Sequence, residues 1–119
     1  VGLWQSRVAD RMVPYLIPQE CGNMLDVRRL SIMGRTGGCL TFTGIPTVEA
    51  NVLPYTPEEM EIAQHQKDLP VSDKTVVRIN YRQTGVGGDD TWSQNARPHE
   101  EFRIRAEEGC HFRFSVKPE

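Results

Sequence analysis

The chain has only three cysteines among its 119 residues, and none of them belongs to a CxxC motif. Cys21, Cys39 and Cys110 are far apart and odd in number, so a structural zinc site is not expected. We expect buried free thiols, as in a reducing compartment, with one disulfide plus one free thiol as the alternative. The compartment itself, cytoplasm or periplasm, stays open because targeting signals would lie outside this sequence.

A charge excess of one sign and long apolar runs are also absent. The net charge is −2 with 25% charged residues, which gives no electrostatic reason to expect nucleic acid or an anionic membrane as a partner. No apolar stretch approaches the ~20 residues needed to span a bilayer. The chain begins with Val1 rather than an initiator methionine, so we expect it to be a piece of a longer polypeptide.

The 13.5 kDa chain suits a single domain over residues 1–119, and folding of a chain this size buries roughly two-thirds of its unfolded surface. Prolines and glycines recur every several residues, which favours short strands joined by turns. Apolar and polar residues alternate, as in half-buried strands, over residues 29–32, 40–43, 77–82, 101–105 and 111–116.

The last two of these segments flank Glu107-Glu108-Gly109, a short connection that predicts a β-hairpin. One helix is expected near residues 57–66, because Thr56 to Glu59 form a capping box with Pro57 at the first helical position. Its apolar stripe would contain Met60, Ala63 and Ile62. The fold class is therefore all-β, an antiparallel β-sandwich with one short helix.

Catalytic residues are not evident. A retaining glycosidase needs two carboxylates about 5 Å apart across the sugar bond. The acidic pairs have simpler explanations as helix-capping residues and as solvated turn residues, and the histidines have neither metal spacing nor a nucleophile partner. These residues are Glu58, Glu59, Glu107, Glu108, His65, His99 and His111. We expect no catalytic residue, metal site or cofactor in this chain.

The most unusual segment runs from Gly85 to Ser93 and reads Gly-Val-Gly-Gly-Asp-Asp-Thr-Trp-Ser. It lacks the Gly-Lys-Ser/Thr ending of a phosphate-binding loop. Asp89 and Asp90 are not part of an Asp-x-Asp-x-Asp series, so a bound cation is the lesser alternative. We expect both carboxylates to bond backbone amides and fix the turn.

Trp92 stands at the end of this segment. Tryptophans most often pack in a core, but the neighbours of Trp92 (Asp89, Asp90, Ser93, Gln94 and Asn95) are all polar. An indole on a glycine-pinched loop presents a flat surface on which the C–H face of a sugar stacks. Trp92 is therefore the candidate substrate-binding residue. Trp4, beside Gly2 and Leu3, is expected to be a packing or docking residue.

Nearly the whole chain, from about Gly2 to Pro118, resembles the C-terminal part of the last domain of β-galactosidases of glycoside hydrolase family 2, the lactose-splitting type. Several spaced motifs in the right order carry this resemblance, and the one around Trp92 is the most diagnostic. They are Gly2-Leu3-Trp4, Pro14-Tyr15, Pro18 to Asn23, Asp26-Val27-Arg28, Tyr55-Thr56, Ala63-Gln64-His65, Asp68-Leu69, Gly85 to Ser93 and Phe112 to Pro118. Arg29 departs from the pattern, since many relatives carry an aromatic residue there.

The resemblance implies a galactose mutarotase-like supersandwich that docks on a separate catalytic (β/α)₈ barrel holding the two glutamates and the Mg²⁺ ions. It also implies that Trp92 reaches the mouth of that barrel and binds the β-galactoside, with loop support from Gly87, Gly88, Asp89, Asp90 and Ser93. Within the family motifs, Glu20, Asp26 and Arg28 are expected to be structural or domain-docking residues.

Three hypotheses remain open from the sequence. The chain is a non-catalytic β-galactosidase domain that completes the substrate cleft, an autonomous carbohydrate-binding module, or a purely structural and assembly domain. The last alternative predicts self-association through unpaired strand edges and an exposed apolar face.

Overall fold

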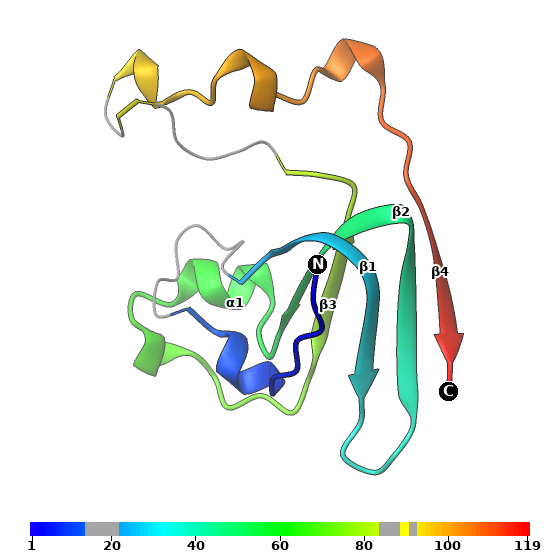
Figure 1. The fold of residues 1–119 in the computed structure, drawn as a ribbon. Coiled ribbons are helices and arrows are strands. Elements are labelled where there is room, and N and C mark those ends of the chain that lie inside the picture. The colour runs from blue at the N-terminus through cyan, green and yellow to red at the C-terminus, as the bar shows by residue number, and fades with distance from the viewer. Residues whose placement is uncertain (14–21, 84–88, 91–92) are drawn as a thin grey trace. The chain divides into compact units, whose positions relative to one another are not determined.

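A computed structural model describes residues 1–13, 22–83, 89–90 and 93–119 of the chain. Its strands are β1 (Met24–Met33), β2 (Cys39–Leu53), β3 (Val76–Asn80) and β4 (Arg113–Pro118), and its α-helix is α1 (Pro57–Ile62) (Figure 1). Short 3₁₀ turns complete it: η1 (Val8–Arg11), η2 (Gln66–Asp68), η3 (Gln94–Ala96), η4 (Glu100–Phe102) and η5 (Ala106–Glu108). No described helix is long and apolar enough to cross a bilayer.

The described strands form one four-stranded sheet in the order β1-β2-β3, and β4 also pairs with β2. The predicted all-β class with one short helix is therefore confirmed. Within the described residues the strands belong to this single sheet. The chain divides into two compact units, which are described separately below. The first comprises Val1–Val27 with Glu49–Ile79, and the second comprises Arg28–Val48 with Asn80–Glu119.

The core of the first unit lies where β2 meets α1. Leu53 and Met60 are completely buried, and Ala50, Val52 and Ala63, which are close to them along the chain, are also buried. Burying a side chain such as Leu or Met contributes about 1.5–3 kcal/mol. Every residue from 48 to 53 is buried, so this part of β2 is covered on both faces.

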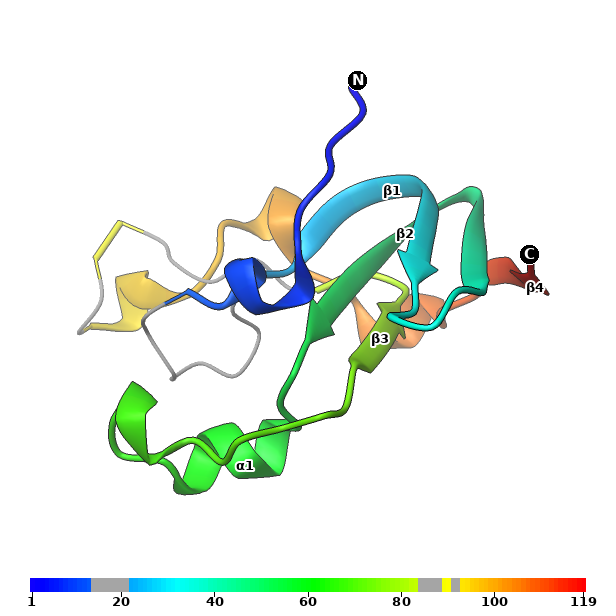
Figure 2. The same ribbon diagram turned by 90° about the horizontal axis from the view of Figure 1, so that it is seen from below.

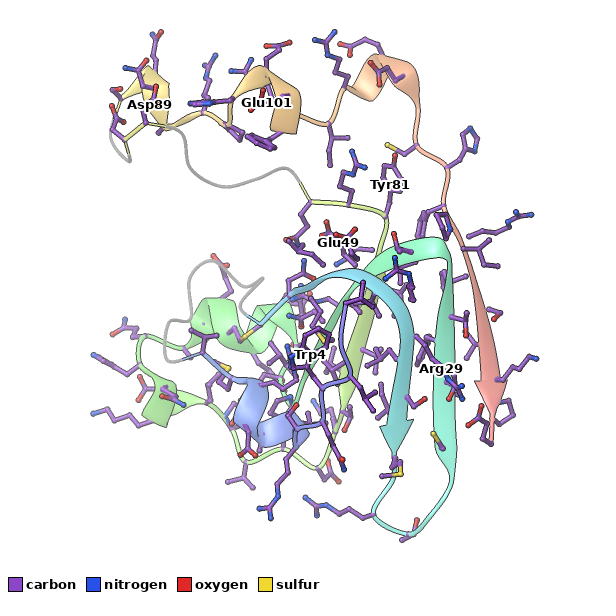
Figure 3. All side chains as sticks on the ribbon, in the orientation of Figure 1. Trp4, Arg29, Glu49, Tyr81, Asp89 and Glu101 are labelled. Carbon is purple, nitrogen blue, oxygen red and sulfur yellow. The ribbon has the colours of Figure 1, made fainter. Side chains whose placement is uncertain are left out.

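A part-buried polar contact lies at the start of that run. Glu49 is only 9% exposed, and its Oε2 accepts a hydrogen bond of 2.9 Å from Nδ2 of Asn23. A buried carboxylate without a hydrogen-bond donor costs several kcal/mol, so the Asn23 amide makes this position tolerable. Figure 3 labels Glu49 on its strand.

Helix α1 begins as its sequence predicts. The hydroxyl of Thr56 accepts from the amide of Glu59 at 3.2 Å, and the Glu59 carboxylate accepts from the amide of Thr56 at 2.8 Å. These two bonds satisfy backbone donors that have no partner within the helix. Met60 and Ala63 are buried as expected, whereas Ile62 is 81% exposed.

The helix is shorter than predicted, because it ends at Ile62 and a separate turn follows. The Asp68 carboxylate accepts from the amide of His65 at 3.0 Å and so begins η2 (Gln66–Asp68) instead of extending α1. Figure 2 shows α1 and η2 as successive turns before the chain extends into β3.

Strand β2 is bent at Gly44. A Cβ atom at this position would lie 2.7 Å from the carbonyl carbon of Thr47 and from the nitrogen of Val48, which is closer than real Cβ atoms approach. Only glycine allows the backbone to pass itself so closely. Pro46, which has no amide to donate to the ladder, lies within the same bend.

The second unit is built on the first half of β2. Strand β4 pairs with it in antiparallel register from Leu40↔Pro118 to Ile45↔Arg113, and the backbones of Cys39 and Glu119 exchange two further bonds of 2.8 and 2.9 Å. Figure 1 shows β1 beside β2 on the side away from β4. The hydroxyls of Ser31 and Thr41 are 2.8 Å apart across the β1–β2 pair.

Two predictions about the end of the chain are wrong. Residues 101–105 do not form a strand, and Glu107-Glu108-Gly109 is not a hairpin: η4 and η5 lie there, and β4 pairs with β2 instead. The Glu100 carboxylate bonds Arg103 at 3.0 Å and Arg105 at 2.7 Å, which are contacts of a turn rather than of an extended strand. Phe102 remains 61% exposed, since no described strand covers it.

The capping box should make a measurable contribution to the free energy of unfolding. Thr56→Ala removes the acceptor for the Glu59 amide and should lower the free energy of unfolding by about 1 kcal/mol. Thr75→Ala is the matched control, because Thr75 is exposed just before β3. Urea unfolding of both variants tests this, and an equal change in the two would contradict it.

The same helix should be acid-sensitive. The amide of Thr56, and then the ammonium of Lys74 at 2.9 Å, hold the pKa of Glu59 below its ordinary value of 4.5. Because the folded-state pKa is lowered, the stabilisation is complete above pH 4.5 and is lost as the pH falls through the lowered pKa. Glu59→Gln should flatten this part of the profile of melting temperature against pH. Glu101→Gln, at an exposed position in the other unit, should leave the profile as in the unchanged chain.

Candidate functional site

The polar segment around position 92 is held by short-range hydrogen bonds. The Asp90 carboxylate accepts from the amide of Ser93 at 2.9 Å and from its hydroxyl at 2.5 Å. The Ser93 hydroxyl in turn accepts from the amide of Asn95 at 3.0 Å and so caps η3 (Gln94–Ala96). The prediction that Asp90 bonds a backbone amide and fixes the turn is confirmed.

Asp89 bonds residues that lie further along the chain than those bonded by Asp90. Its amide donates to the carbonyl of Asn95 at 2.8 Å, and its carboxylate oxygen Oδ1 lies 2.9 Å from Nε2 of His99. Among the described residues, the side-chain partner of Asp89 is therefore an imidazole rather than an amide. Figure 3 labels Asp89 at the start of the stretch that leads into η3.

His99 is the residue that the sequence analysis missed. It was grouped with His65 and His111 as dispersed, because its partner Asp89 lies ten positions earlier, outside any local motif. We define the residues joined by these bonds, Asp89, Asp90, Ser93, Asn95 and His99, as the loop brace. The other predicted site residues, Trp92, Gly87 and Gly88, lie outside the described residues.

The loop brace is at the surface. Ser93, Gln94 and Asn95 are exposed, and neither η3 nor η4 contains a buried residue. The described residues of η3 and η4 are therefore not part of an apolar core.

The acidic residues described here cap a helix, form ion pairs with arginines or are exposed to solvent. Glu59 caps α1, Glu100 pairs with two arginines, and Glu107 and Glu108 are solvated as expected although their turn is 3₁₀. Among the residues that the structure describes, no group of three or more His, Cys, Asp or Glu side chains is placed to hold a metal ion.

Trp4 is not a core residue. Trp4 is 80% exposed. Its ring lies against Gly2, and a Cβ atom built at Gly2 would be 3.0 Å from the ring. Of the two roles expected for Trp4, packing within this chain is excluded and docking remains. Its label in Figure 3 marks it on the N-terminal stretch.

The thiol prediction needs correction. Cys39 and Cys110 are free, as expected, but Cys39 is only half-buried and Cys110 is exposed. Cys39 is the first residue of β2, and Cys110 lies in the exposed connection before β4. Neither cysteine lies among the buried apolar residues. Cys21 lies outside the described residues.

The family-motif residues Asp26 and Arg28 are exposed on β1, and Glu20 lies outside the described residues. Asp26 has a φ of 52°, in the left-handed region that aspartate tolerates better than most residues. Arg29 pairs with the Glu119 carboxylate at 3.0 Å, so β1 is tied to the end of β4 at this position (Figure 3).

A row of half-exposed aromatic rings lies along β4, and we call it the aromatic row. The ring centres of Tyr81 and Phe112 are 6.1 Å apart, and those of Phe112 and Phe114 are 5.9 Å apart. Tyr81, Phe112 and Phe114 are 36–44% exposed, and Val116 continues the same face of β4 at 46%. Apolar surface of this kind marks an interaction site when it is contiguous.

Known proteins similar to this chain are β-galactosidases. A family model described as beta galactosidase small chain matches residues 1–116. The β-galactosidase of Priestia megaterium is 43% identical over 118 residues, which cover 99% of this chain and 11% of that protein. The β-galactosidase of Streptococcus thermophilus is 34% identical over 119 residues, again 99% of this chain and 11% of that protein.

The β-galactosidase small subunit of Latilactobacillus sakei is 31% identical over 118 residues, which cover 88% of this chain and 36% of that subunit. The chain thus spans about 11% of the length of the first two relatives and about a third of the small subunit. Nearly every residue lies within the match to the family model. The chain belongs to the beta galactosidase small chain family.

Proposed function

We propose that this chain is a non-catalytic domain of a retaining β-galactosidase of glycoside hydrolase family 2 that hydrolyses terminal β-D-galactosides such as lactose. In this proposal Trp92 stacks on the leaving-group sugar at the edge of the substrate cleft. The proposal combines the family of the chain with the surface position of the loop brace. Hydrogen bonds on both sides of position 92 are the single observation that carries it.

The loop brace suits a stacking residue for an energetic reason. A binding loop that is ordered before the sugar arrives loses less conformational entropy on binding. The glycines and the two aspartates make this loop poorly suited to a core and well suited to a fixed surface turn. An indole in such a turn gains stacking energy without first having to be ordered.

The proposal assigns the chemistry to other parts of the parent enzyme. Double displacement with retention needs an acid/base and a nucleophile, and these would belong to the (β/α)₈ barrel together with the Mg²⁺ ions. The isolated chain would therefore be inactive. Its contribution to turnover would be binding energy directed at the leaving-group sugar.

The first test of this function is Trp92→Ala in the full-length β-galactosidase. Losing one stacking aromatic should cost about 0.5–1.5 kcal/mol, which is roughly a two- to tenfold loss of kcat/KM for lactose. Methyl β-D-galactoside, whose leaving group has no ring to stack, should be affected much less. Steady-state kinetics on the two substrates measure the difference.

Trp4→Ala is the control, because Trp4 is an exposed tryptophan outside the loop brace. Unchanged kinetics for lactose in the Trp92 variant would refute the assigned role. Calorimetric titration of the isolated chain with lactose separates this role from an autonomous carbohydrate-binding module. Millimolar or tighter binding that depends on Trp92 would favour the module.

A second function, domain assembly, is favoured by the aromatic row. We propose that the rest of the parent β-galactosidase polypeptide covers it. The first two relatives have about nine-tenths of their length outside the match, so a parent enzyme of similar length would contain protein that can cover the row. Covering three half-exposed aromatic residues would stabilise the assembled enzyme by a few kcal/mol.

Phe112→Ser tests this assembly role. It should lower the melting temperature of the full-length enzyme, because a buried ring is replaced by a hydroxyl at the interface. The unfolding free energy of the isolated chain should fall less, because Phe112 is 44% exposed there and loses its contacts with Tyr81 and Phe114 but no interface. Ile62→Ser, at an 81% exposed apolar residue outside the row, is the control. Equal effects of both substitutions on the full-length enzyme would argue against the row as an interface.

A further inference from the structure

We infer that the outer edge of β4, the edge turned away from β2, is a strand-pairing site whose occupant is an extended acidic segment of the parent β-galactosidase. This inference rests on the proposed assembly role of the aromatic row and names the kind of partner that the assembly brings to β4. The residues of this edge belong to the second compact unit, and the structure describes each of them.

The backbone bonds between Cys39 and Glu119 set which groups of β4 face β2. In an antiparallel ladder, pairs that exchange both bonds alternate with pairs whose backbone groups point away from each other. Cys39 and Glu119 exchange bonds of 2.9 and 2.8 Å and continue the register of the β2–β4 ladder. The amides and carbonyls of Phe114 and Val116, which fall on the other alternation, therefore point to the outer edge.

That edge is open among the described residues, where β4 pairs with β2 alone (Figure 1). Outward-facing edge groups of this kind are a template for a further strand. Pro118 falls on the same alternation as Val116, so its missing amide costs no bond to β2. The edge thus offers two amides, from Phe114 and Val116, and the carbonyls of all three residues.

The side chains of β4 define the chemistry of the strand that fits. On one face, Phe114 belongs to the aromatic row and Val116 continues it, and they are 37% and 46% exposed. On the other face Arg113 and Lys117 are exposed, and within the described part of the chain neither is in an ion pair. Opposite charges on neighbouring strands stabilise their pairing. A strand with acidic residues four positions apart, and with apolar residues next to them, would match both faces.

A second copy of the chain fits this edge less well. If two copies of β4 pair antiparallel through their outward groups with Phe114 opposite Val116, Arg113 of one copy lies opposite Lys117 of the other. Like charges directly opposite each other destabilise a pair of strands. The first two relatives have about nine-tenths of their length outside the match, so a parent enzyme of similar length would contain other segments for this role.

Hydrogen exchange in the full-length β-galactosidase, read by mass spectrometry at single-residue resolution, tests the pairing. The amides of Ser115 and Lys117 face β2 and are the internal reference. With the outer edge occupied, the amides of Phe114 and Val116 should exchange within about tenfold of this reference after correction for intrinsic rates. Exchange of these two amides on the order of a hundredfold faster than the reference would show an open edge and overturn the inference.

Charge reversal tests the acidic character of the partner. The double variant Arg113→Glu with Lys117→Glu places carboxylates opposite the acidic strand and should speed exchange of the two outward amides about tenfold. Arg35→Glu with Lys67→Glu is the matched control, because it replaces one exposed arginine and one exposed lysine outside β4. It should leave the exchange unchanged. No effect of the β4 variant, or an equal effect of the control, would overturn the inference.

The outcomes separate strand pairing from the assembly role. Fast exchange at the outer edge together with a destabilising Phe112→Ser would overturn the pairing and leave the assembly role intact. Protected outward amides with equal effects of Phe112→Ser and Ile62→Ser would support the pairing and refute the row as an interface. Protection that is lost when the enzyme is diluted to a monomer would make a second copy the occupant and overturn the inference.

Discussion

The close approach of the β2 backbone to itself at Gly44 is the constraint on which the rest of the structure depends. Without a Cβ there, the strand bends before Val48, so its first half pairs with β4 and its second half enters the core beside α1. One 15-residue strand thereby contributes to both compact units. Any larger residue would require the Thr47–Val48 backbone to move, and with it the start of the buried run.

This use of β2 leaves the two units unequal. Among the described residues, five of the seven buried hydrophobic side chains lie in the unit that contains α1, and the other two, Phe42 and Val48, lie in the second unit. The second unit therefore exposes a large apolar surface compared with its small number of buried residues. The aromatic row is part of this exposed surface. Its order depends on backbone pairing with β2 and on local polar contacts such as Arg29 with Glu119. A unit of this kind gains stability when further protein covers it.

The features predicted well from the sequence are those that depend on local chemistry. The capping box at Thr56 and Glu59 and the Asp90 turn each require residues no more than three positions apart. The alternation at Phe102 and Ile104 misled because a strand also needs a neighbour, which periodicity does not supply. The Asp89–His99 contact was missed for a related reason: its two residues are ten positions apart and neither has a distinctive neighbourhood.

The proposed non-catalytic role is consistent with what the described acidic residues do in the fold. General acid and nucleophile carboxylates need environments that move their pKa values apart. Glu59 is held ionised by a helix terminus and by Lys74, and Glu100 lies between two arginines at the surface. These two carboxylates serve folding, and under the proposed function the contribution of the chain to turnover would be geometric. In that proposal the loop brace, a polar turn at the surface, would supply that geometry.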